Sequence, residues 1–233
     1  MTQVHPNFFK LGVLNLHPYA SLAVVGRHQI SKCHTCGRTR NASEGPATAH
    51  FADRGRAWYD FLHTENGFLL ISDRVRDGLI RNEIGGWESF PVSVVGVESR
   101  SLRKKNMPQY HWLKITGQIE VDDSKDIIGD VKYCPECKHL EGIKGPDRLV
   151  PIARNLAEIG FFNVSNFWFS YIVCSYGIIE LARSQKWTNM RFDPIDLPGR
   201  IRPLPEPINY LGDPWPPVSW YPDEVDPDPR NFE

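Results

Sequence analysis

Four cysteines in two CxxC pairs are the residues of this chain whose type and spacing could do chemistry. The pairs are Cys33-His-Thr-Cys36 and Cys134-Pro-Glu-Cys137, and they begin 101 residues apart. A CxxC turn places two thiolates on one side of a tight loop, and Zn²⁺ prefers four such ligands in a tetrahedron. The spacing therefore predicts one closed zinc site with Cys33, Cys36, Cys134 and Cys137 as its ligands.

The sequence leaves two other interpretations of these thiols open. Each pair could be a separate redox centre, or the cysteines could form disulfides or remain free. A thioredoxin-like centre is disfavoured because neither pair follows a βαβ strand and opens a helix. A closed four-thiolate shell has no open position for water, so we expect structural rather than catalytic zinc. The fifth cysteine, Cys174, ends an apolar run and is expected to be a small buried hydrophobe.

No other arrangement of residues matches a well-marked catalytic or cofactor-binding motif. His34 and His139 lie beside the thiols and could replace a ligand, although exposed side chains are the more common case at such turns. The remaining histidines form no HxxxH or HxH pattern. The chain also lacks GxSxG, a phosphate-binding glycine loop and a dinucleotide fingerprint. We therefore expect a protein that is not an enzyme, with no catalytic or organic-cofactor residues.

A shared zinc site requires the two distant loops to meet, and an internal repeat supplies a reason. Short sequence segments recur in the same order at offsets of about 100 to 104 residues, which indicates an ancient tandem duplication. Besides the CxxC pairs, the matches are 8–11 with 112–115, 45–46 with 145–146, 71–72 with 174–175, and, loosely, 90–92 with 192–195. Two related halves packed about an approximate two-fold axis would bring equivalent loops face to face.

Each half is predicted to contain a strand, a helix and a returning strand. In the first half the strands are expected at 67–71 and 90–97. The helix between them is capped by Ser72 and closed by Gly85-Gly86, and its apolar face consists of Val75, Leu79, Ile80 and Ile84. In the second half the elements are a strand at 171–174, a helix capped by Ser175 with Ile178, Ile179 and Ala182 inside, and a strand at 190–195. Additional strands are expected at 8–16 and 110–121, and a helix at 149–159.

These elements predict an α+β fold made of two related strand-helix-strand halves that are joined by a shared zinc site. We expect the first half to span 1–98 and the second 107–195, each with one CxxC knuckle, in one compact unit. The basic stretch 99–106 is predicted to be an exposed connector. The tail 196–233 contains ten prolines among scattered aromatics and acidic residues, which excludes helix interiors and central strands. A disordered terminus and an extended strap that docks on the body both remain open, and the aromatics favour the strap.

Composition limits the classes of protein to which the chain can belong. Of its 233 residues, 41% are hydrophobic and 12% aromatic, which predicts a soluble globular protein. The net charge of −1 provides no basic field for a polyanion, so nucleic acid is not expected to be the main partner. No apolar run reaches the ~18–20 residues of a membrane span, and no secretory signal precedes the first half. We expect a cytoplasmic protein that does not bind membranes.

The order of the motifs resembles the bacterial double-CxxCG family. The similarity covers about residues 30–196 and consists of CHTCG at 33–37, the stretch FLLISDRVRD at 68–77, the second CxxC pair, and MRFDPI at 190–195. The chain departs from the pattern at Lys138, where the family has a second glycine. That family is associated with immunity proteins of contact-dependent or polymorphic toxin systems. The resemblance implies a cytoplasmic protein that binds and neutralises one cognate protein toxin without turnover.

The second hypothesis for the function is a zinc-ribbon-like protein that binds nucleic acid or has a regulatory role. It is favoured by the four basic residues Arg100, Arg103, Lys104 and Lys105 and disfavoured because no aromatic residues are interleaved with them. A third hypothesis is an enzyme of unmarked type, which a deep pocket with converging polar groups would indicate. The sequence does not determine the oligomeric state.

Overall fold

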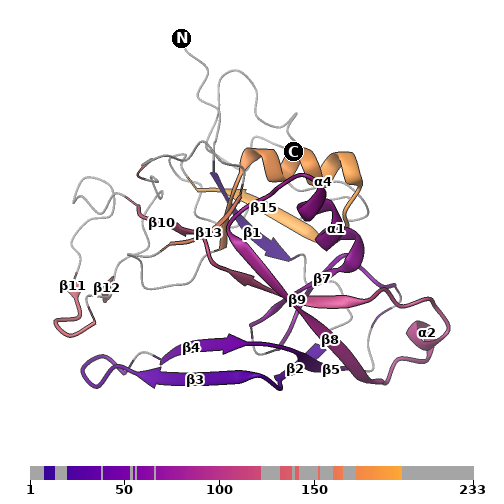
Figure 1. Ribbon diagram of the computed structural model, residues 1–233, viewed down its shortest axis with the longest axis horizontal. Helices are drawn as coiled ribbons and strands as arrows, with labels where there is room; N and C mark the ends of the chain where they lie inside the picture. The colour runs from indigo at the N-terminus through magenta and orange to yellow at the C-terminus, as the bar shows by residue number, and fades with distance from the viewer. Residues whose placement is uncertain are drawn as a thin grey trace, which may run out of the picture.

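The structure is a computed structural model, and it describes residues 8–13, 20–37, 39–52, 55, 57–65, 67–121, 132–137, 140–141, 152, 160–164 and 172–195 (Figure 1). Within these residues the chain forms mixed β-sheets with few helices, so the α+β class is confirmed and strands predominate. The predicted helix at 149–159, except for Ile152, and the tail 196–233 lie outside the described residues.

Two larger sheets make up the body of the protein. The six-stranded sheet has, in order, β2 (Ala20–Val24), β5 (Ala47–Phe51), β8 (Trp87–Val97), β9 (Tyr110–Ile115), β7 (Leu69–Ser72) and β6 (Phe61–His63). The five-stranded sheet has β10 (Gln118–Ile119), β13 (Phe161–Val164), β14 (Ile172–Ser175), β1 (Phe8–Val13) and β15 (Met190–Pro194). The helices among the described residues are α1 (Asp73–Arg81), α2 (Arg100–Arg103) and α4 (Tyr176–Gln185).

Two further β-hairpins are separate from these sheets. One joins β3 (Arg27–Lys32) to β4 (Thr39–Glu44), and the other joins β11 (Lys132–Tyr133) to β12 (Leu140–Glu141). Figure 1 shows both hairpins at the same end of the molecule, away from α1 and α4. The sequence analysis missed these four strands because their mostly polar residues show no hydrophobic alternation.

Helix α1 begins as the sequence predicts and ends earlier. The Ser72 hydroxyl accepts a hydrogen bond from the backbone N–H of Val75, 3.4 Å away, which caps the first turn. The prediction that Ile80 faces the core is wrong, because its side chain is 53% exposed. The predicted closure at Gly85-Gly86 is also wrong. The chain turns at Glu83, whose φ is 52°, and the N–H of Ile84 bonds to the carbonyl of Leu79.

Helix α4 ends in the same way, 103 residues later in the chain. Lys186 has a φ of 51°, and the N–H of Trp187 bonds to the carbonyl of Ala182. The predicted inner face of Ile178, Ile179 and Ala182 is fully buried. Ser175 stands at the N-cap, but its hydroxyl accepts a hydrogen bond from the backbone N–H of Gly160 rather than from the helix. This bond therefore joins the start of α4 to the residue that precedes β13, which pairs with β14.

The two sheets contain four-stranded units of identical order. One unit is β6-β7-β9-β8 and the other is β13-β14-β1-β15. In each unit, the first two strands form an antiparallel pair, a helix follows the second, and the last strand returns beside a central strand. Equivalent pairings also match, since Ser72 faces Tyr110 in one unit and Ser175 faces Phe8 in the other.

The central strand of each unit comes from the other half of the sequence. Strand β1 precedes all elements of the first half, yet it lies between β14 and β15 of the second. Strand β9 opens the second half, yet it lies between β7 and β8 of the first. A division of the sequence at residue 98 thus separates neighbours within both sheets. Each half depends on the other for the middle of its sheet.

Two hydrophobic clusters fill the body. The first lies between α1, α4 and both sheets, and residues of both halves share it. Its members include Phe9, Leu79, Leu113, Ile179 and Phe192. The second lies against β2, β5, β8 and β9 and has Phe51, Tyr110 and Trp112 among its members. Burial of this apolar surface is the main source of stability for such a body.

Candidate metal centre

The two CxxC pairs occupy equivalent turns of the two small hairpins. Lys32 pairs with Thr39 at the end of the first hairpin, and Tyr133 pairs with Leu140 at the end of the second. In the first turn, the N–H of Gly37 bonds to the carbonyl of Cys33 at 3.0 Å, and Gly37 has a φ of 71°, which glycine adopts without strain. Short antiparallel strands therefore carry each pair of thiols at the tip of a hairpin turn.

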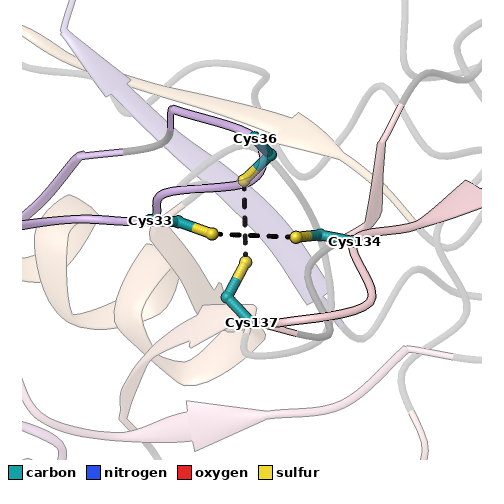
Figure 2. A group of neighbouring side chains, drawn as sticks. All are labelled: Cys33, Cys36, Cys134 and Cys137. Atoms are coloured by element: carbon teal, nitrogen blue, oxygen red, sulfur yellow. Dashed lines mark hydrogen bonds between the residues drawn. The ribbon is translucent and has the colours of Figure 1, made fainter.

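All four thiols that the sequence selects come together (Figure 2). The Sγ atoms of Cys33 and Cys134 are 3.7 Å apart, and those of Cys36 and Cys137 are also 3.7 Å apart. The four sulfur atoms all lie within 4.8 Å of one another. A tetrahedron with Zn–S bonds of about 2.3 Å has S···S edges of about 3.8 Å, whereas a disulfide bond is about 2.05 Å long. The cluster thus has dimensions that suit a metal ion and not a disulfide.

The cluster is symmetric with respect to the two CxxC turns. Each cysteine faces its own counterpart 101 residues away, so Cys33 meets Cys134 and Cys36 meets Cys137. Figure 2 shows the two facing pairs crossing, with all four sulfur atoms directed toward one centre. Exchange of the two hairpins would map the cluster onto itself. This is the face-to-face contact that an approximate two-fold relation between the halves produces.

A direct hydrogen-bonded contact also joins the two turns. A carboxylate oxygen of Glu136 accepts hydrogen bonds from the Thr35 hydroxyl at 2.7 Å, the Thr35 N–H at 3.1 Å and the Cys33 thiol at 3.3 Å. The Thr35 hydroxyl, followed by the Cys33 thiol, holds the pKa of Glu136 below its usual range. Thr35 and Glu136 hold equivalent positions in the two turns. The sequence analysis missed them, although their common offset could have paired them.

Among the described residues, the members of the cluster are the four cysteines. Cys134 is fully buried, and Cys33, Cys36 and Cys137 are partly buried. His34 is exposed and does not belong to the cluster. His139 and Lys138 lie outside the described residues. Four soft thiolates in a tetrahedron favour zinc or iron over calcium or magnesium.

The fifth cysteine has a different environment. Cys174 is fully buried in the first hydrophobic cluster, where it pairs with Phe9 and Phe161 on the neighbouring strands. Burial raises the pKa of its thiol far above the usual range. The prediction that Cys174 is a small buried hydrophobe is confirmed, and its raised pKa makes it a poor nucleophile and a poor metal ligand.

A second polar cluster, which we call the Asp60 network, holds the halves together away from the metal centre. The Asp60 carboxylate accepts hydrogen bonds from the Ser72 hydroxyl at 2.8 Å, from the Thr188 N–H and hydroxyl at 2.9 Å each, and from the Arg74 guanidinium. Arg74 also donates to the carbonyls of Gln185 and Lys186 at the end of α4. The carboxylate is nearly buried and fully supplied with donors, so its role is structural.

A second contact of similar backbone geometry contains glycines. Gly160, Gly177 and Gly85 lie 100 to 103 residues from Asp60, Arg74 and Thr188 respectively. The backbone nevertheless repeats its hydrogen bond, because Phe61 N–H donates to Thr188 O at 3.3 Å and Phe161 N–H donates to Gly85 O at 3.2 Å. Both contacts thus contain the same kind of backbone hydrogen bond, and only the contact at Asp60 also has charged side chains.

No protein-family model matches the sequence, and no curated protein matches it. Among the described residues, none of the helices has the length and apolar character that crossing a membrane requires. The function is therefore inferred from the cysteine cluster, the fold that positions it and the order of motifs in the sequence.

Proposed function

We propose that this protein is a non-catalytic binding protein whose two halves share one structural Zn²⁺ ion, held by Cys33, Cys36, Cys134 and Cys137. The single observation that carries the proposal is the spacing of the four sulfur atoms, with facing pairs 3.7 Å apart. Zinc is favoured because it is bound by four thiolates without redox chemistry in sites that have a structural role. Such a shell leaves no position for a substrate or an activated water.

The same proposal includes an internal duplication. Its support is the identical strand order of the two four-stranded units and the matching ends of α1 and α4. Glu83 and Lys186, which both have positive φ, are 103 residues apart, and so are Gly86 and Asn189. Neither glutamate nor lysine favours this conformation, so its recurrence 103 residues later supports common descent of the two turns.

For the biological role we propose immunity, in which the protein binds and neutralises a cognate toxin in the cytoplasm. The support is the order of motifs that resembles the double-CxxCG family, and one of these motifs has a defined place in the fold. The Ser72-Asp73-Arg74 sequence stands at the start of α1, where Ser72 caps the helix and Arg74 bonds to Asp60. A metal that stabilises a scaffold fits a protein that acts by binding.

The toxin is expected to be encoded next to this protein, and growth rescue tests the role. Cells that express such a neighbouring toxin should stop growing, and co-expression of this protein should restore growth and yield a stoichiometric complex on purification. A variant that lacks all four clustered cysteines should rescue less well at equal expression, because its knuckles are not held together.

Failure of the wild-type protein to rescue growth or to bind the toxin would exclude immunity for that pair. The same purified protein should then be titrated with DNA and RNA at several salt concentrations. Salt-dependent binding there would favour the nucleic-acid hypothesis, for which the structure provides four exposed basic side chains around α2.

A further inference from the structure

The hairpins that carry the thiols are peripheral to the body. Neither hydrophobic cluster of the described residues contains a member of the segments 27–44 or 132–141. The hairpins form two-stranded sheets of their own, and the second has only two residue pairs. A two-stranded hairpin is marginally stable in water when nothing packs against it. We call this pair of hairpins the knuckle arms.

The first arm is anchored to the body at its base. Lys114 donates a hydrogen bond to Glu44 at 2.6 Å, and the indole N–H of Trp112 donates to Gly45 O at 2.9 Å. Gly26 lies so close to the carbonyl of Glu44 that an added Cβ would stand 1.9 Å from its oxygen. These contacts fix where the arm leaves the six-stranded sheet and do not reach its tip.

The body, in contrast, joins the two halves without the metal. Strands β1 and β9 are exchanged between the halves, so each large sheet contains a central strand from the other half. The first hydrophobic cluster is shared by both halves, and the Asp60 network joins α1 to the end of α4. These interactions bury the side chains that stabilise a fold, whereas the thiols lie outside them.

We infer that the metal acts as a local clip on the knuckle arms, and that its removal releases the arms from one another while the body stays folded. This inference rests on the proposed zinc site. Without a metal, the tips keep the thiol contacts and the hydrogen bonds from Thr35 to Glu136, and these residues are exposed, so water competes for the bonds. Metal loading therefore decides whether the arms form one rigid unit.

Release of the knuckle arms would separate exposed residues that a partner could bind together. The exposed residues His34, Thr35, Pro135 and Glu136 come from both tips and lie together only while the arms are joined. A partner that contacts both tips would thus bind the metal-loaded protein and lose the contact when the metal leaves. The arms would give the protein a metal-dependent interaction surface on a metal-independent body.

Hydrogen exchange of the full-length chain, with zinc and after chelation, tests the inference. Amides in 27–44 and 132–141 should exchange at least about tenfold faster after chelation, because local opening replaces metal-bound order. Amides of β1, β7, β9 and β14 should keep their protection. The Cys36→Ser variant should show the same pattern without a chelator.

The outcomes separate this inference from the proposed zinc site. Metal analysis of the same samples decides whether zinc binds at all, and its absence would overturn both. If zinc binds and the strands of the body lose protection together with the arms, the zinc site stands and the local clip is wrong. If the arms keep their protection without zinc, the clip is also wrong.

A cleavage experiment provides an independent measurement. A protease site inserted between Lys104 and Lys105, in the exposed turn after α2, divides the folded chain between the halves. The two pieces should remain one particle in gel filtration after cleavage and chelation, because β1 and β9 are exchanged. Separation by chelation alone would show that the metal, and not the body, joins the halves.

Discussion

Replacement of Cys134 by serine is expected to weaken zinc binding by more than about a hundredfold, since loss of a group that only orients a ligand already costs about 10–100-fold. Cys134 is the fully buried member of the cluster, and its sulfur lies 3.7 Å from that of Cys33. A serine hydroxyl is a poor replacement for a soft thiolate. Competition with a chromophoric chelator measures the affinity of the wild type and of the variant.

The fifth cysteine provides the matched control for this experiment. The Cys174→Ser variant also loses a buried thiol, but Cys174 lies in the hydrophobic core and not in the metal cluster. Its zinc affinity should equal that of the wild type even if its melting temperature falls. Cys33→Ser should weaken binding as strongly as Cys134→Ser, because the two residues are equivalent. Wild-type affinity in Cys134→Ser would remove this residue from the ligand set.

Replacement of Asp60 by alanine is expected to lower the free energy of unfolding by about 3 kcal/mol, a value typical of breaking a nearly buried ion pair. The variant leaves the Ser72 hydroxyl, the Thr188 N–H and the Arg74 guanidinium without their common acceptor. Arg74 is 51% exposed, so water compensates part of its loss. Urea unfolding of the two proteins at the same zinc concentration measures the difference.

Asp77→Ala is the control for Asp60→Ala. Asp77 is exposed on α1, and its ion pair with its neighbour Arg76 is of the kind that contributes little to stability. This change should alter the free energy of unfolding by less than about 0.5 kcal/mol. Equal effects of the two substitutions would show that the Asp60 network does not hold the halves together. Zinc stoichiometry should remain unchanged in both variants.

Local signals in the sequence predicted several elements of the body correctly. Apolar runs that end in serine located β7 and β14, and the spacing of apolar residues located the inner faces of the helices that follow. Ile80 was misplaced because it lies about 140° around the helix from Val75, off the buried face of Val75, Gly78 and Leu79. The end of the helix was misplaced because the chain turns at Glu83, which has a positive φ. A left-handed glutamate has no signal in the sequence, whereas the following glycines do.

The candidate site was predictable because its chemistry depends on residue type and on the repeat. Two CxxC pairs at one offset selected the four cysteines that the fold brings together. The exchange of β1 and β9 was not predictable, because a repeat in the sequence is compatible with strands that pair within a half or between halves. That choice depends on tertiary packing around the shared core, which includes Phe9 and Leu113. The Thr35–Glu136 contact depends on the same arrangement.

The central claim is that distant thiols of the two halves bind one common zinc ion. Native mass spectrometry of the purified full-length chain, with elemental analysis of the same sample, measures this directly. The proposed site predicts one zinc ion per chain and none in a variant with Cys33 and Cys134 both changed to serine. Two zinc ions per chain, one for each CxxC pair, or a wild-type protein that binds none would contradict it.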